Sequence, residues 1–380
     1  MSESYEDSYT IHFRGFTEMI LFHSAQSRES QWTRIPVNTL KVEPLFENSL
    51  RCGNSSLFPY PISEGAVKDT AKNLGLALDL EGEYYPLRDT AYKSLLDRAR
   101  ISGAALQKLR RDDLSKTLNA CLALYKDSAL LLFREQKITA VHSGDQKDYS
   151  ILPINELMES LKTNLDERFP GNMFDSGYSD HSLTSAAWLL PDQKEDLLGT
   201  YRKTLESQGK GAIAAKLTPG IRFSTSDTGI ASAKVTALLL GLPYPINIGG
   251  TIATEHRGQK QISDFTDSLN MLFAQFESSV KRLEKLTEMY LDNPINVMTA
   301  VCKHLAMPKK AALEAIGMFE MSCGGGAMTA HDVFMAMQEI MFICKTDNVP
   351  MNKMLQLEES MARALTVNWS QFDTKKAVNW

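Results

Sequence analysis

Residues 219–240 read PGIRFSTSDTGIASAKVTALLL, and this stretch decides the fold class. Two apolar runs, near 219–225 and 232–240, stand on either side of the turn residues 226–229. Apolar runs of this length around a polar turn that contains glycine are typical of a β-hairpin. Hydroxyl and carboxylate side chains in such a turn can bond nearby backbone amides, and Gly229 can adopt a positive φ. The stretch therefore predicts two antiparallel strands, and a structural turn is the simpler interpretation of 226–229.

Similar patterns lie on both sides of this hairpin. Short apolar runs predict further strands at 129–133, 138–142, 173–178, 183–190 and 246–256. Helices are predicted between them, at 153–165 and 192–207. Because the strands follow one another as hairpins and do not alternate regularly with helices, the sequence predicts an α+β fold. Its sheet would be mainly antiparallel, with flanking helices.

Three regions follow from the distribution of these patterns. Residues 1–62 contain aromatic residues and prolines but no long periodic segment, which predicts an irregular, partly strand-forming N-terminal arm. Residues 63–262 are predicted to form an α+β core domain. Residues 263–380 predict a C-terminal all-helical region, because apolar side chains recur there every three or four residues. This region is expected to begin with one long helix at 263–292 and to continue as four shorter helices.

Methionine is concentrated in the C-terminal region, where twelve of the seventeen methionines fall within 289–361. Methionine fills irregular helical cores and also forms adaptable partner surfaces. A helical core is the simpler interpretation, and a subunit or partner interface is the alternative. The long helix at 263–292 is the expected self-association surface of a homo-oligomer.

The chain has 380 residues, 43% of them hydrophobic, and a formal net charge of -5. No stretch reaches the length of about 18 apolar residues that a membrane span needs, and the first residues are acidic where a signal peptide is basic. The sequence therefore predicts a cytoplasmic protein without a membrane partner. The five cysteines are scattered without a C-x-x-C pair, which in a reducing compartment is typical of small buried side chains.

The common catalytic and nucleotide-binding motifs are missing from the sequence. It contains no G-x-x-x-x-G-K-[ST] phosphate loop, no G-x-G-x-x-G, no H-E-x-x-H and no G-x-S-x-G. The seven histidines include no pair at metal-ligand spacing on a helix, so neither a metal nor another cofactor is predicted. An enzyme would need residues that converge from strand ends, and the candidates are Asp227, Glu255 and His256. The sequence thus favours a non-enzymatic protein.

Charge is unevenly distributed along the chain. Residues 145–200 hold eleven acidic and four basic residues, whereas residues 202–260 hold eight basic and three acidic ones. Residues 92–118 are also basic, with seven basic and three acidic residues. Clustered lysine and arginine favour polyanions, because their binding releases condensed counterions. The alternative is an ordinary solvated surface, since charged runs usually face water.

The basic stretches supply the predicted nucleic-acid or anion-binding residues, which are Arg222, Lys234, His256, Arg257, Lys260, Lys210, Lys216, Arg110 and Arg111. The turn motif among them is Ser226, Asp227 and Gly229. The functional alternative to a purely structural turn is an anion-binding rim formed around it by Arg222, Lys234, His256 and Arg257. Single strands also favour aromatic stacking platforms, of which this region offers only Tyr201, Phe223 and Tyr244.

Three segments together resemble a family of uncharacterised phage and plasmid proteins that are often labelled phage/plasmid-like. They are Pro219–Gly229, the Glu255-His256-Arg257-Gly258 step and the Asp148-Tyr149-Ser150-Ile151-Leu152 step. The resemblance extends over about residues 85–290, although Thr225 stands where the family commonly has Asn. It implies an origin in a mobile element but no settled activity. The hairpin-rich sheet backed by helices is also similar, at the level of fold, to single-strand annealing proteins.

These observations lead to three hypotheses. The leading one is a non-enzymatic phage or mobile-element protein that binds single-stranded DNA as an oligomer in the host cytoplasm, in recombination or replication. The second is an interaction protein that inhibits or titrates a host defence protein through its acidic segment or its methionine-rich helices. The third is an enzyme whose residues converge from strand ends.

Overall fold

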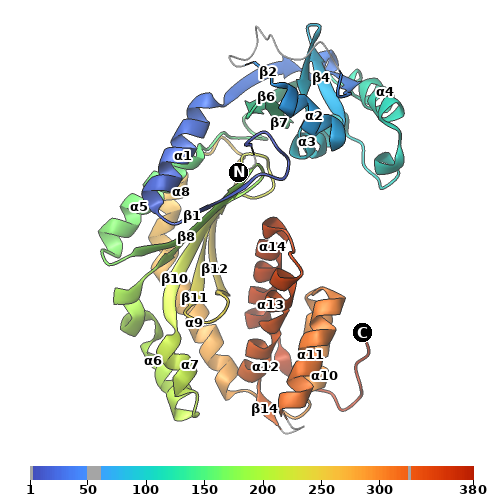
Figure 1. Cartoon of the computed structure of the whole chain (residues 1–380). Coiled ribbons are helices and arrows are strands. Elements are labelled where there is room, and N and C mark those ends of the chain that lie inside the picture. Colours follow the sequence, from blue (N-terminus) through green and yellow to red (C-terminus); the bar gives the residue numbers. More distant parts are fainter. Residues whose placement is uncertain (1–2, 49–60, 324–326) are drawn as a thin grey trace.

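The structure, a computed structural model of the chain, describes residues 3–48, 61–323 and 327–380. The molecule has the outline of an open arc (Figure 1). A six-stranded antiparallel sheet forms the middle of the arc. A smaller lobe built from residues 31–44 and 64–143, which we call the upper lobe, lies at one end. The C-terminal helices lie at the other end and face the upper lobe across a gap between the ribbons.

The central sheet has the strand order β1-β8-β9-β10-β11-β12, and every neighbouring pair is antiparallel. Its strands are β1 (Thr10–Phe13), β8 (Met173–Asp180), β9 (Thr184–Leu189), β10 (Thr218–Thr225), β11 (Ala233–Leu240) and β12 (Ile246–Thr254). The hairpin predicted at 219–240 is β10 and β11. The predicted α+β fold with a mainly antiparallel sheet is thereby confirmed.

Helices cover both faces of the central sheet. The helices on one face are α1 (Phe16–Glu29), α5 (Ile154–Arg168) and α8 (Ile262–Ser268). Those on the other face are α6 (Lys194–Ser207), α7 (Gly211–Lys216) and α9 (Leu272–Glu288). Trp188 and Phe223 are buried against the first set, and Leu239 and Ile248 against the second. Burial on both faces explains why the central strands carry nearly continuous apolar runs.

The upper lobe contains two three-stranded antiparallel sheets, β2-β6-β7 and β3-β4-β5. Their strands are β2 (Gln31–Pro36), β3 (Lys41–Pro44), β4 (Leu76–Leu80), β5 (Glu83–Pro86), β6 (Ser128–Arg134) and β7 (Lys137–Ser143). They share one core with the helices α2 (Glu64–Lys72), α3 (Asp89–Ala99) and α4 (Arg111–Leu122). The hairpin predicted at 129–133 and 138–142 is β6 and β7.

The arm predicted at residues 1–62 forms strands, as expected, but it also contains a helix that the prediction did not include. The described part of this region contains helix α1 and the strands β1, β2 and β3, which belong to three different sheets. Each of these strands pairs with a later part of the chain, so no local pattern reveals it. The sequence prediction misses α1 because its buried residues are only Met19 and His23, which is a weak apolar periodicity. Residues 1–2 and 49–60 of the predicted arm lie outside the described residues.

The C-terminal region is helical, as predicted, but the single helix expected at 263–292 is wrong. A 3-10 turn at Leu269–Met271 separates α8 from α9, and its Asn270 accepts hydrogen bonds from Arg168. Asparagine has a low helix propensity, and the contacts of Asn270 with Arg168 of α5 favour the break at this point. α9 then ends at Glu288, and β13 (Tyr290–Leu291) pairs with β14 (Met328–Thr329).

Among the described residues, five helices follow α9, one more than the four predicted. They are α10 (Pro294–His304), α11 (Lys309–Cys323), α12 (Ala330–Met337), α13 (Glu339–Thr346) and α14 (Met351–Ala362). Several methionines of this region are buried in one core, including Met298, Met307, Met337, Met341 and Met361. The interpretation of the methionines as core residues is therefore confirmed for these positions, and self-association stays a prediction.

Candidate functional site

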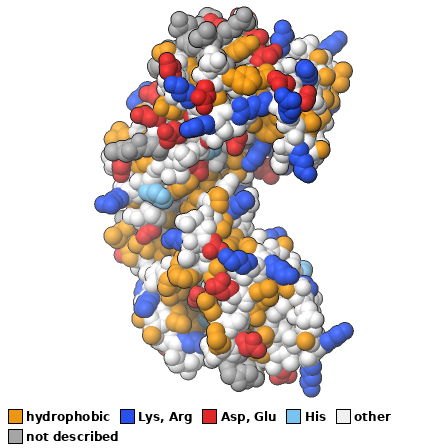
Figure 2. All heavy atoms as spheres, turned by 45° about the vertical axis from the view of Figure 1, so that its right-hand side comes forward, with side chains coloured by type: hydrophobic (Ala, Val, Ile, Leu, Met, Phe, Trp, Pro, Cys, Tyr) orange, Lys and Arg blue, Asp and Glu red, His pale blue; other side chains and the backbone are white. Residues whose placement is uncertain are grey.

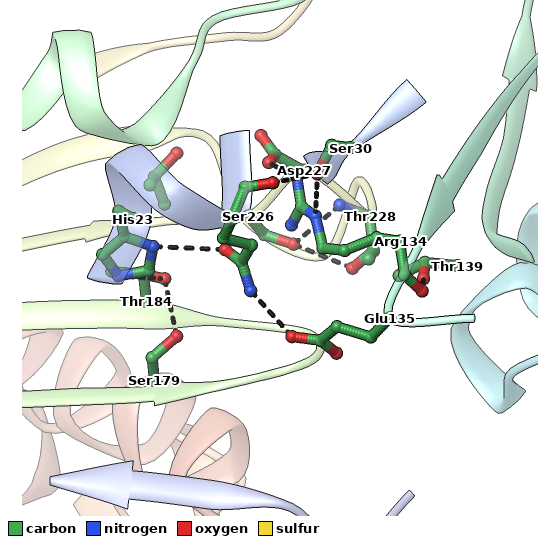
Figure 3. Close-up of polar contacts among 12 residues, drawn as sticks. His23, Ser30, Arg134, Glu135, Thr139, Ser179, Thr184, Ser226, Asp227 and Thr228 are labelled. Carbon is green, nitrogen blue, oxygen red and sulfur yellow. Dashed lines mark hydrogen bonds and ion pairs between the residues drawn. The ribbon is translucent and has the colours of Figure 1, made fainter. Parts of the chain in front are cut away.

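The turn between β10 and β11 lies where the central sheet meets the upper lobe, a region that we call the interlobe junction (Figure 3). The Asp227 carboxylate pairs with Arg134 of β6, and 2.5 Å separate Oδ2 from Nη2. The side chains of Arg134 and Asp227 are only 8% and 6% exposed. The Nε of Arg134 also donates to the hydroxyl of Ser30 at 2.7 Å. Because these opposite charges are buried together, the pair fastens the turn to the upper lobe.

The other residues of the turn motif hold its shape. Ser226 Oγ donates to the carbonyl of Ser182 at 2.5 Å and accepts from the backbone N–H of Thr228 at 3.1 Å. Gly229 has a φ of 78°, in the left-handed region that favours glycine. These contacts are internal to the protein and are those of a structural turn.

Four aromatic rings stack across the same junction. The rings of His142 and Tyr149 are parallel within 7°, with their centroids 3.7 Å apart. Tyr149 also lies 5.8 Å from His256, and Trp32 of β2 lies 6.1 Å from His142. The Tyr149 hydroxyl donates to the backbone carbonyl of Asp227 at 2.9 Å, and Nε2 of His142 lies 2.8 Å from the same oxygen. The stack thus connects the upper lobe and the central sheet beside the turn.

Burial keeps the rings of the junction uncharged. Desolvation lowers the pKa of His142 to about 4, and it lowers the pKa of His23 in α1 to about 4 as well. The pKa of His256 is also lowered by burial, whereas the phenol pKa of Tyr149 is raised well above its usual value. At neutral pH these histidines are therefore neutral. His256, a predicted anion-binding residue, adds no positive charge to a rim.

Most of the other predicted cations are paired with carboxylates, namely in Arg222–Glu358, Lys234–Glu359, Arg257–Glu255, Lys260–Asp264 and Lys210–Asp332. Arg111 donates instead to backbone carbonyls, those of Leu45 and Ala71. Arg110 directly precedes α4, and Lys216 ends α7. Since α4 lies in the upper lobe and α7 near the opposite end of the arc, these three residues are distant from the turn (Figure 1). Lys234, His256 and Arg257, in contrast, line one hollow that also includes Gly229 of the turn.

Of the three residues named for an enzyme, Glu255 and His256 line one hollow, and Asp227 is not part of that lining. The Asp227 carboxylate is held by Arg134, and Glu255 forms an exposed pair with Arg257. Nε2 of His256 lies 3.1 Å from the hydroxyl of Thr225. In the part of the chain that the structure describes, no group of three or more His, Cys, Asp or Glu side chains is arranged to hold a metal ion.

A groove between β12 and the C-terminal helices brings together cations that are distant in the sequence. This β12 groove has a volume of about 530 Å³. It is lined by Lys234 of β11, Arg282 of α9 and Arg363, the first residue after α14. Glu359 is the one acidic side chain in this lining among the described residues. A second hollow of about 440 Å³ is lined by residues 229–232 and by three predicted residues, Lys234, His256 and Arg257. Figure 2 shows Lys and Arg side chains, with acidic ones among them, around the hollow between the upper lobe and the C-terminal helices.

Two of the three groove cations contact hydroxyl groups and, among the described residues, no carboxylate. Nη2 of Arg282 donates to Ser279 Oγ at 2.9 Å, and Nη2 of Arg363 donates to Ser360 Oγ at 2.6 Å. A guanidinium has five N–H donors, so each arginine keeps donors for an anion. Neither residue is predicted from the sequence, because both lie outside the basic stretches 92–118 and 202–260 and no local motif marks them.

Comparisons with known proteins give no match: no family model, curated protein or solved structure matches the chain. The resemblance to phage/plasmid-like proteins therefore stays a prediction, together with the origin and location that it implies. Within residues 3–48, 61–323 and 327–380, no helix combines the length and the apolar character that a membrane span requires.

Proposed function

We propose that the protein binds single-stranded nucleic acid and holds its phosphate groups in the β12 groove. The observation that carries this proposal is the convergence of Lys234, Arg282 and Arg363 on one groove with a single acidic side chain. Guanidinium groups match phosphate oxygens through paired N–H donors, and such charge-assisted hydrogen bonds are stronger than neutral ones. Three cations from three different elements give an extended anionic chain several points of contact.

The shape of the groove favours a single strand over a duplex. One wall is β12, the edge strand of the central sheet, and the others are contributed by α9 and by α14 with the turn that follows it. Gly249 of β12 has a φ of 78° and lines the groove without a side chain, so a ligand can approach the backbone closely there. Gly250 is instead buried against α9, where a Cβ atom would lie 2.8 Å from the carbonyl oxygen of Gln275. An extended strand can follow such a channel, whereas a duplex presents its phosphates on a rigid rod.

Phosphate contacts, and not base stacking, are expected to supply the affinity. Among the residues that the structure describes, no aromatic side chain lines the β12 groove. The rings of the interlobe junction stack on one another and are largely buried, so they do not offer free faces to bases. We therefore expect binding that tolerates different base sequences and weakens steeply with salt.

Fluorescence anisotropy with a labelled thymidine oligonucleotide tests the proposal. The variant Arg282→Gln/Arg363→Gln should bind more weakly, and its salt dependence should flatten by about 0.7 in log–log slope for each phosphate that the protein no longer neutralises. The matched control is Arg14→Gln/Arg28→Gln, which removes the same charge from exposed residues before and within α1. Salt-independent binding, or equally weakened binding by both double variants, would overturn the proposal.

A further inference from the structure

Two consecutive glutamates of α14 reach the central sheet. Glu358 pairs with Arg222 of β10, and Glu359 pairs with Lys234 of β11, where 2.8 Å separate Oε1 from Nζ. Both cations belong to the set that the sequence predicts to bind anions. Helix α14 therefore places a carboxylate where a phosphate group of a ligand would be expected.

The two pairs differ in their access to water. Arg222 and Glu358 are 11% and 10% exposed, whereas Lys234 and Glu359 are 24% and 44% exposed. A buried pair is structural, because removing one partner leaves an unpaired buried charge. An exposed pair contributes little to stability and can exchange partners. Of the two glutamates, only Glu359 lines the β12 groove.

We propose that Glu359 is an intramolecular competitor of the ligand: its carboxylate occupies Lys234 in the free protein and gives way to a phosphate group when nucleic acid binds. This inference rests on the proposed function of the β12 groove. Glu359 also stands four residues before Arg363, a spacing at which helical side chains are neighbours. Its negative charge therefore weakens the attraction of two groove cations for phosphate.

The exchange requires only a side-chain movement. Met354, Leu357 and Met361 anchor α14 in the C-terminal core, with exposures of 8%, 8% and 1%. Because these contacts do not involve the Glu359 carboxylate, α14 stays in place when the carboxylate leaves Lys234. Variants at Glu359 are thus expected to fold like the wild type.

Anisotropy titrations with the same oligonucleotide at fixed low salt test this role. Glu359→Gln should bind about twofold to fivefold more tightly, the change expected for the loss of one exposed ion pair. The matched control is Glu64→Gln, which removes an exposed glutamate from its pair with Lys68 in the upper lobe and should leave the affinity unchanged. In the Lys234→Gln background, Glu359→Gln should produce a smaller increase in affinity, because the lysine that pairs with Glu359 is then absent.

The outcomes separate the two proposals. Binding with equal affinity by the wild type, Glu359→Gln and Glu64→Gln would overturn the competitor role and leave the proposed function intact. An increase that persists in full in the Lys234→Gln background would also overturn it, since a general charge effect then explains the increase. No binding by any variant would overturn the proposed function and this inference with it. Glu359→Ala provides an independent version of the test, because it leaves no side-chain oxygen for Lys234.

Discussion

The interlobe junction and the β12 groove are both rich in polar side chains, but they use them differently. In the junction, the Arg134–Asp227 pair is almost fully buried, and two rings bond the backbone carbonyl of Asp227. In the groove, the Lys234–Glu359 pair is reached by water, and Arg363 is exposed. Buried and satisfied polar groups fix one arrangement, whereas accessible groups can exchange an internal partner for a ligand. The turn motif that stands out in the sequence therefore belongs to the structural region.

The largest expected effect comes from breaking the junction. Asp227→Ala leaves the Arg134 guanidinium buried without a counter-ion, so the free energy of unfolding should fall by about 3–5 kcal/mol. Urea unfolding followed by tryptophan fluorescence measures this change. The double variant Arg134→Met/Asp227→Leu removes both charges and should recover most of the stability. A decrease below about 0.5 kcal/mol, the range of ordinary surface substitutions, would show that the pair is not structural.

The second-largest effect is expected from acidification, which should lower the stability of the junction. The folded-state pKa of His23 and of His142 is about 4, against an ordinary value of 6.5. Between these values the unfolded chain binds more protons, so stability is full above pH 6.5 and falls as the pH drops toward 4. Each histidine contributes a slope of at most about 1.4 kcal/mol per pH unit.

The variant His142→Gln isolates this contribution. Its free energy of unfolding, measured by urea titration at several pH values between 4 and 7, should depend less on pH than that of the wild type. The pH dependence is compared, and not the absolute stability, because the substitution also removes a stacked ring. Identical slopes in the two proteins would contradict the assignment.

The smallest expected effect on stability is in the groove. Arg363→Gln removes an exposed cation and should change the free energy of unfolding by less than about 0.5 kcal/mol. The same variant should nevertheless weaken oligonucleotide binding, so both quantities are measured on one preparation. A destabilisation as large as that of Asp227→Ala would remove the distinction between the two regions.

The parts of the fold that could be predicted are those whose determinants are contiguous. The β10–β11 hairpin carries both strands and its turn within 219–240, so local patterns are sufficient. The ion pairs are different, because their partners are distant in the sequence. Arg134 and Asp227 are separated by 93 residues, and Arg222 and Glu358 by 136 residues. The charge of a segment does not show which of its cations will be neutralised by a distant carboxylate.

The β12 groove illustrates the same limit for the site. Lys234 is among the predicted residues, but its companions Arg282 and Arg363 come from α9 and from the turn after α14. Each is an ordinary arginine in its own segment, and only the packing of helices on the edge of the sheet brings the three together. His256 is the opposite case: it is a predicted site residue beside the turn, but its ring is buried in the aromatic stack.

The position of β1 in the central sheet also determines when, during translation, this strand can pair with its neighbour. Thr10 pairs with Asp180, so β1 has no partner strand until roughly 170 more residues have been made. At roughly 5–20 residues per second, translation of this length takes about 10–30 seconds. β2 likewise has no partner strand until β6 has been made, since Trp32 pairs with Leu132. β1 thus joins the central sheet only after β8 has been made.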